Sequence, residues 1–219
     1  MANWKEIKRR IKSIKNTAKI TKAMELISTV KMKKAQDLAN SKKAFIMEVL
    51  KVFLRVEASL KNYPLFSEKI DWKTLWVLLT SNKWLCGWYN VNVLKALNNY
   101  KKTTGEDMDF VAVWKRASQF VARTWNNLIA DFSEWFSDNI DTSFSRSISR
   151  FLTDQFLTNW YAKVEIFYNH YVNTIKQIAI SRKFVSISKE EIMTYLLDTL
   201  WEDEKFLDEV RKDIWVVYD

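Results

Sequence analysis

A run of 58 residues near the N-terminus, residues 5–62, contains neither glycine nor proline, and it constrains the fold more than any other feature. Its apolar residues recur at spacings of three and four, which is typical of a helix. The series comprises Ile7, Ile11, Ile14, Ala18 and Thr21, then Ile20, Met24 and Ile27, and later Leu38 to Leu60. At 1.5 Å per residue this helix would reach about 87 Å. A helix of this length cannot bury all of these apolar residues against a small domain. We therefore expect it to pack against a partner helix, as in a coiled coil.

The helical pattern ends at Pro64, and the remaining chain alternates between short apolar runs and amphipathic segments. Such alternation predicts crossover units and a largely parallel sheet, so the fold class is α/β. We expect strands at residues 75–80, 109–113, 127–132, 164–168 and 175–187, the last of them paired as a hairpin. We expect helices at residues 91–102, 115–123 and 142–157, and an acidic helical tail from residue 189.

Positive charge is concentrated in the first helix. Residues 1–43 hold 13 Lys or Arg and three Asp or Glu, while the remaining chain is close to neutral. The net charge of +9 therefore belongs to one element and not to the whole fold. One interpretation is a solvated helix face, and another is a nucleic-acid-binding protein with a basic helical arm.

The sequence offers little material for catalysis or metal binding. One cysteine, Cys86, and one histidine, His170, cannot supply a usual structural zinc site, and both are better explained by structural roles. The acidic turn at Glu202, Asp203 and Glu204 most simply faces solvent. We find no triad, metal cluster or acid–base pair, so we predict no catalytic residue, no cofactor and no metal. Neither a secretory signal nor a membrane-spanning run is evident.

Three segments resemble one family. They are KEIKRRIKSIKNTAKITKAMELISTVKMKKAQ in the first helix, SNKWLCGWYNVNVL after the first expected strand, and FYNHYVNTIKQ near residue 170. Together they resemble the gamma subunit of the rotary F-type ATP synthase, and KITKAME is the most specific of these matches. The resemblance implies a shaft helix over residues 1–63 and a Rossmann-like α/β domain over residues 64–219.

The resemblance also implies a function, its partners and its site residues. It implies a non-catalytic central-stalk rotor that couples proton translocation to conformational changes in the catalytic subunits. The implied partners are the alpha and beta subunits of the head, and the epsilon subunit and c-ring at the foot, without nucleic acid or membrane insertion. The location is the cytoplasmic face of the bacterial inner membrane, as a peripheral subunit. The rotor–stator contact falls on Lys19, Lys22, Met24, Met32 and Lys33, and coiled-coil packing on Ile7, Ile11, Ile14, Ile20 and Ile27.

A Rossmann-like nucleotide-binding enzyme is a third interpretation, and the loop at residues 81–90 would be its binding site. Exposed amides at a helix start attract anions. However, the loop matches neither the Walker spacing nor the G-x-G-x-x-G pattern. We therefore do not predict nucleotide binding at this loop.

Tryptophan stands where glycine belongs in several turns. The chain holds 2 Gly and 11 Trp, although about 15 glycines would be ordinary for this length. Trp84 and Trp88 occupy family glycine positions in the loop, and Trp114, Trp125, Trp135 and Trp160 also fall in expected turns. We hypothesise that UGA codons meaning glycine are written here as tryptophan; the alternative is a Trp-rich protein. The hypothesis predicts these residues at element ends, whereas Trp76 lies in a strand pattern and tests nothing by itself.

The C-terminus is the second departure from the family. The resemblance would place a further long helix after Val217, Tyr218 and Asp219, where this sequence stops. We therefore expect the partner of the first helix to be missing, which would leave Ile7, Ile11, Ile14 and Met24 exposed.

Overall fold

The computed structural model describes residues 2–60, 63–67, 73–83, 86–124, 126–134, 142–159, 161–188, 191–192 and 194–195. The chain divides into two compact units, one up to Arg55 and one from Val56 onward. Each unit is described by itself below.

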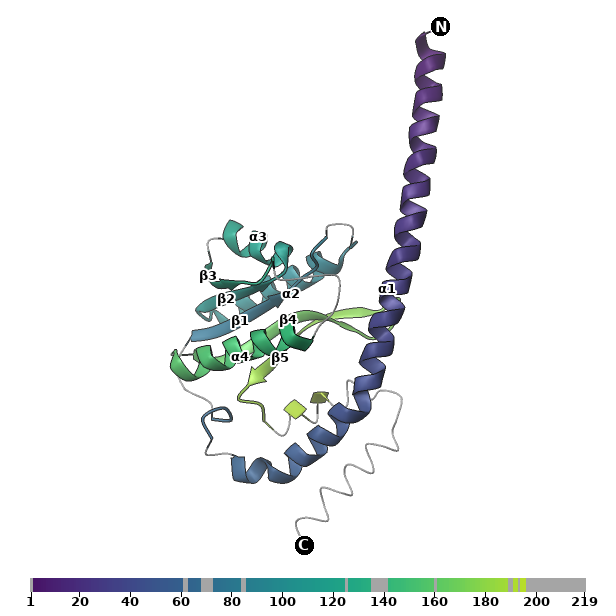
Figure 1. The fold of residues 1–219 in the computed structure, drawn as a ribbon. Coiled ribbons are helices and arrows are strands. Elements are labelled where there is room, and N and C mark those ends of the chain that lie inside the picture. Colours follow the sequence, from purple (N-terminus) through teal and green to yellow (C-terminus); the bar gives the residue numbers. More distant parts are fainter. Residues whose placement is uncertain are drawn as a thin grey trace. The chain divides into compact units, whose positions relative to one another are not determined.

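Helix α1 runs without interruption from Ala2 to Leu60, as the sequence predicts (Figure 1). Its 59 residues correspond to about 89 Å of helix. Threonines in its first half bond their hydroxyls to carbonyl oxygens one turn back, as Thr17 does to Ser13 at 3.0 Å and Thr29 to Glu25 at 2.9 Å. These hydroxyls share carbonyl oxygens that belong to the helical hydrogen-bond ladder, an arrangement that satisfies them inside a helix at a small cost in its stability.

The second unit is built on a five-stranded sheet in the order β3-β2-β1-β4-β5 (Figure 1). Strands β1 (Lys73–Leu79), β2 (Met108–Val113), β3 (Asn127–Asp131) and β4 (Tyr161–Tyr171) are parallel. Strand β5 (Gln177–Val185) returns antiparallel to β4 as a hairpin. A largely parallel sheet with an antiparallel edge strand is a common α/β arrangement, and it confirms the predicted fold class.

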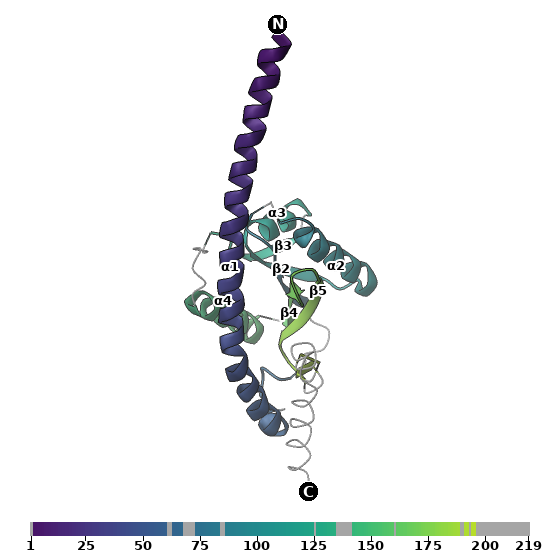
Figure 2. The same ribbon diagram turned by 90° about the vertical axis from the view of Figure 1, so that its right-hand side faces the viewer.

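Helices cover both faces of this sheet, as Figure 2 shows. Helices α2 (Tyr89–Thr104) and α3 (Lys115–Arg123) pack on one face around Trp76, Phe110 and Phe167. Helix α4 (Thr142–Thr158) packs on the other face through Leu152 and Phe156. Strands β1 and β2 are buried on both faces, which explains why their sequences are continuous apolar runs.

The predicted elements differ from the observed ones mainly at their ends. Strand β4 begins at Tyr161, three residues before the apolar run that predicts it, and β5 is shorter than residues 175–187. Lys163 and Glu165 break the apolar pattern of β4, yet both lie in the strand and form an ion pair at 3.0 Å. Pairing with β1 therefore extends the strand beyond what hydrophobicity alone indicates.

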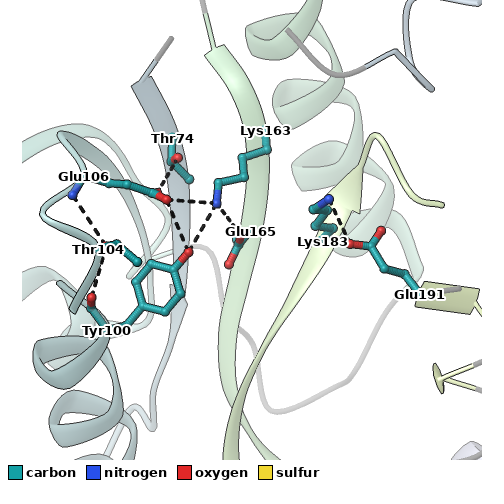
Figure 3. A network of polar contacts seen from close by, with 8 residues as sticks. All are labelled: Thr74, Tyr100, Thr104, Glu106, Lys163, Glu165, Lys183 and Glu191. Carbon is teal, nitrogen blue, oxygen red and sulfur yellow. Dashed lines mark hydrogen bonds and ion pairs between the residues drawn. The ribbon is translucent and has the colours of Figure 1, made fainter. Parts of the chain in front are cut away.

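A polar network lies on the α2 face of the sheet and is shown in Figure 3. Lys163 reaches between Glu165 and Glu106, at 3.0 and 3.3 Å, and donates to the Tyr100 hydroxyl at 3.2 Å. Thr74 donates to the other oxygen of Glu106 at 2.9 Å. Burial lowers the pKa of Lys163, but the hydrogen bond to Glu165 and the charge of that group outweigh this effect and raise the pKa above its ordinary value. The network thus joins the loop after α2 to strands β1 and β4.

Candidate functional site

The candidate site is the surface of α1, where an apolar line follows the helix axis. Ile7, Ile11 and Ile14 are 43%, 48% and 60% exposed. Their spacing of four and three places them on one face, which Ala18 continues. Met24 is 42% exposed, so the predicted exposure of all four side chains is confirmed. A continuous exposed apolar face of this kind normally marks an interface.

A second line on α1 consists entirely of lysines. Lys8, Lys12, Lys15 and Lys19 each follow a residue of the apolar line by one position, and Lys22, which follows Thr21, continues the same spacing. One residue corresponds to about 100° of helical rotation, so the two lines run side by side. Lys22 pairs with Glu25 at 3.0 Å, and both side chains are well exposed. This face therefore presents regularly spaced positive charge.

The structure separates residues that the sequence analysis grouped together. Ile20 and Ile27 lie on a different face from Ile7 and Ile14, since six residues correspond to about 120° of displacement. They form a second apolar line with Met24, again at spacings of four and three. The expected packing set of five isoleucines is therefore two lines on two faces, because a drifting stripe in sequence need not stay on one side of a straight helix.

The expected rotor–stator residues also divide between faces. Lys19, Lys22 and Lys33 lie on the lysine side of the helix, whereas Met24 belongs to the second apolar line. Met32 is 40% exposed and falls on the side of Ile7 and Ile14. The five residues therefore do not share one face of the helix.

Small side chains lie between the two apolar lines and form a shallow groove, a feature that the sequence analysis missed. Ser13, Thr17 and Thr21 line it beside Ile14 and Ala18, and the paired side chains of Lys22 and Glu25 close one end. Both threonine hydroxyls are turned back onto helix carbonyl oxygens, at 3.0 and 2.9 Å, so they are already satisfied. An apolar group placed in the groove would therefore not leave these two hydroxyls unpaired. The spacing of these small residues at four is the signal that would have revealed it.

The loop between β1 and α2 holds the only cysteine in a hydrogen-bonded cluster. Asn90 donates to the sulfur of Cys86 at 3.0 Å, and the hydroxyl of Ser81 lies 3.3 Å from that sulfur. Asn90 also accepts from the amide of Ser81 at 2.9 Å. These bonds tie the start of α2 to the end of β1, which agrees with a structural role for Cys86. Trp84 lies outside the described residues.

The remaining candidates show no chemical cluster. His170 follows Tyr168 on β4, and the two rings stack edge to face at 6.3 Å. In the described part of the chain, no group of three or more His, Cys, Asp or Glu side chains could hold a metal. Within the same residues, no helix is long and apolar enough to cross a membrane. Glu202, Asp203 and Glu204 lie outside the described residues.

Two tryptophans expected in turns are described, and both stand at element ends. Trp88 precedes α2 and is 71% exposed, and Trp114 precedes α3. Their placement confirms the prediction for these two positions. Trp125, Trp135 and Trp160 lie outside the described residues. Trp76 is fully buried in β1, between Tyr100 and Phe167, with ring centroids 4.7 Å from each.

Comparisons with known proteins agree on one family. A family model described as ATP synthase matches residues 3–215. The gamma chain of Flavobacterium johnsoniae ATP synthase is 29% identical over 94% of this chain and 73% of that relative. The gamma chain of Methylacidiphilum infernorum is 32% identical over 88% and 67%, respectively. In fold, the chain is similar to a chain of the Tetrahymena thermophila mitochondrial ATP synthase central stalk and c-ring structure, with a TM-score of 0.60 at 19% identity, covering 91% and 89% of the two chains. The chain belongs to the ATP synthase gamma-chain family.

Proposed function

We propose that this protein is the central-stalk rotor subunit of an F-type ATP synthase, in which it couples proton translocation to conformational changes in the catalytic subunits. The observation that carries the proposal is the surface of α1. An exposed apolar line and a lysine line run side by side along the same helix. The first suits a partner helix and the second suits an acidic protein surface, and a shaft inside a ring of subunits needs both.

The mechanism requires no catalytic group on this chain. A shaft whose faces differ contacts three surrounding catalytic pockets unequally at any moment. Each pocket is biased toward an open or a closed state by its differential contact with the shaft, because a partner shifts an equilibrium only by such a difference. Rotation then moves the bias from one pocket to the next. The chain is accordingly a non-catalytic subunit.

The two faces of α1 suggest how its partners are divided. The line of Ile7, Ile11 and Ile14 with its adjoining groove suits a second helix of the shaft. The lysine line, including Lys19, Lys22 and Lys33, suits acidic segments of the alpha and beta subunits. Met24 lies on neither of these faces, so we assign it to an apolar rotor–stator contact. The epsilon subunit and the c-ring are the proposed partners at the foot, on the cytoplasmic face of the membrane.

Co-purification tests the proposal directly. The tagged chain, expressed with the alpha and beta subunits of its own source, should co-purify with both. The resulting complex should hydrolyse ATP faster than the alpha and beta subunits do without this chain. Recovery of nucleic acid that is lost at high salt, without these subunits, would instead support the basic-arm interpretation.

A charge series tests the assigned face. Lys15→Gln combined with Lys19→Gln removes two charges from the lysine line, and Lys42→Gln combined with Lys43→Gln removes two elsewhere on α1 as a matched control. We expect the first pair to weaken assembly about 2–10-fold at low salt and less at high salt, because exposed pairs contribute little each and are screened. Equal effects of both pairs would contradict the assignment.

A further inference from the structure

The connection between β2 and α3 is a single residue. Val113 ends the strand, Lys115 begins the helix, and Trp114 alone makes the turn between them. Its backbone has φ 76° and ψ 155°. The carbonyl oxygen of Trp114 accepts from the amides of Ala117 and Ser118, at 3.1 and 3.3 Å. On the strand side, the carbonyl oxygen of Val113 accepts from the amide of Thr80 at 3.5 Å. The conformation of this one residue is thus fixed from both sides.

A residue with a side chain does not suit this conformation. Positive φ brings Cβ against the backbone, and the region of φ near +76° with ψ near 155° is populated almost only by glycine. Both glycines of the chain, Gly87 and Gly105, also have positive φ. Ser186 is the other described residue that combines a side chain with positive φ, at 62°. Position 114 is the more demanding of these positions, because its ψ of 155° lies outside the left-handed helical region that other residues visit and its side chain is an indole.

The other two described tryptophans of the sheet unit provide a contrast. Trp76 lies in a strand with its ring enclosed by aromatic neighbours, which suits a large apolar side chain, although its indole N–H is buried without a hydrogen-bond partner. Trp88 has φ −80° and ψ −1°, which any residue adopts. Only at position 114 does the backbone itself specify glycine.

We propose that residue 114 is glycine in the protein as its source synthesises it, the codon being read there as glycine. A single glycine lets a strand pass directly into a helix without a loop. The opposing consideration is that Trp114 is partly buried and packs against the core under α4, which offsets some of the backbone cost. The proposal is independent of the proposed function, because it concerns folding of the sheet unit and not assembly.

Two variants of the full chain separate the effect of backbone strain from the effect of side-chain packing on stability. Both remove the indole, so they lose the same packing contacts. The two variants are Trp114→Gly and Trp114→Ala, and only glycine also relieves the strain at positive φ. We expect a Tm about 4–8 °C higher for Trp114→Gly than for Trp114→Ala in thermal unfolding. Position 114 is also a helix N-cap, where glycine is preferred to alanine in any case, so the size of the glycine advantage and not its sign is diagnostic.

Trp88 supplies the matched control. Glycine is also preferred to alanine at helix N-caps, and Trp88 and Trp114 both occupy that position. The same pair of substitutions at Trp88, where φ is ordinary, should give a glycine advantage of no more than about 2–3 °C. An advantage at position 114 no larger than that at position 88 would overturn the conformational argument.

Peptide mass spectrometry of the protein isolated from its source tests the identity of the residue. The peptide that contains position 114 should have the mass calculated with glycine. A mass that corresponds to tryptophan at this position would overturn the proposal whatever the stability of the variants. This measurement also decides the question if neither variant folds.

Discussion

Helix α1 and the sheet unit use apolar residues in opposite ways. In the sheet unit, Leu75, Val77, Val111 and Phe156 are almost fully buried, and they fill two cores on either side of one sheet. In α1, Ile11, Ile14, Ile20 and Ile27 are all about half exposed or more. The sheet unit therefore contains the partners of its own apolar groups, whereas the isoleucines in the first half of α1 stay exposed in the free chain.

This difference locates stability and function in separate parts of the chain. Folding of the sheet unit depends on burial, which contributes about 1.5–3 kcal/mol for each large apolar side chain. The isoleucines of α1 gain little of this contribution in the free chain. Substitutions should accordingly act on folding in one region and on assembly in the other.

The largest effect is expected at Trp76. Trp76→Ala should lower the free energy of unfolding by about 3–5 kcal/mol, because it leaves a cavity beside Tyr100 and Phe167. Chemical denaturation of the free chain measures this loss. A loss below about 1 kcal/mol would show that the sheet core is not tightly packed around this ring.

The next largest effect is expected for Lys163→Met, which should lower the free energy of unfolding by about 3 kcal/mol. Glu165 is only 6% exposed, and it would lose its cationic partner. The pKa of Lys163 is raised, so its stabilising contribution is complete below the ordinary lysine pKa and is lost only as pH rises through the raised value. The difference between wild type and variant should therefore stay constant across neutral pH. A conservative Lys163→Arg variant should recover part of the loss.

Hydrogen exchange compares the two regions without mutation. Amides of β1 at residues 75–78 should exchange at least about 100-fold more slowly than amides of α1 at residues 7–30 in the free chain, a difference of about 2.7 kcal/mol. Binding of the alpha and beta subunits should slow exchange in α1 and leave β1 unchanged. Equal protection of both regions in the free chain would contradict the contrast between them.

The smallest effect is expected at Ile11. Ile11→Ala should change the unfolding free energy of the free chain by no more than about 0.5 kcal/mol, because the side chain is half exposed. The same change should weaken assembly measurably, and Val52→Ala, at an exposed position nearer the other end of α1, serves as its control. A large loss of stability in the free chain would show that Ile11 is already buried there.

Periodicity predicted the elements well because it reflects burial directly. Helix α3 coincides with its predicted span, and α1 covers residues 5–60 of the run without glycine or proline. The start of β4 was placed three residues too late because Lys163 interrupts the apolar run, and its pairing with Glu165 inside the sheet is a contact that hydrophobicity does not encode. The division of five isoleucines into two lines was missed because it depends on cumulative rotation about the helix axis.

The sequence by itself determined the long basic first helix, the α/β class and the family, since these follow from composition, spacing and local motifs. Only the tertiary structure decided what each residue faces. It placed Trp76 inside the core and Trp114 on a backbone that suits glycine, although both are tryptophan in the sequence. The physical reason is that burial and φ depend on how the elements are arranged in space. The sheet partners Phe110 and Glu165 are distant in the chain and fix the environment of position 76. The direct connection from β2 to α3 fixes the conformation of position 114.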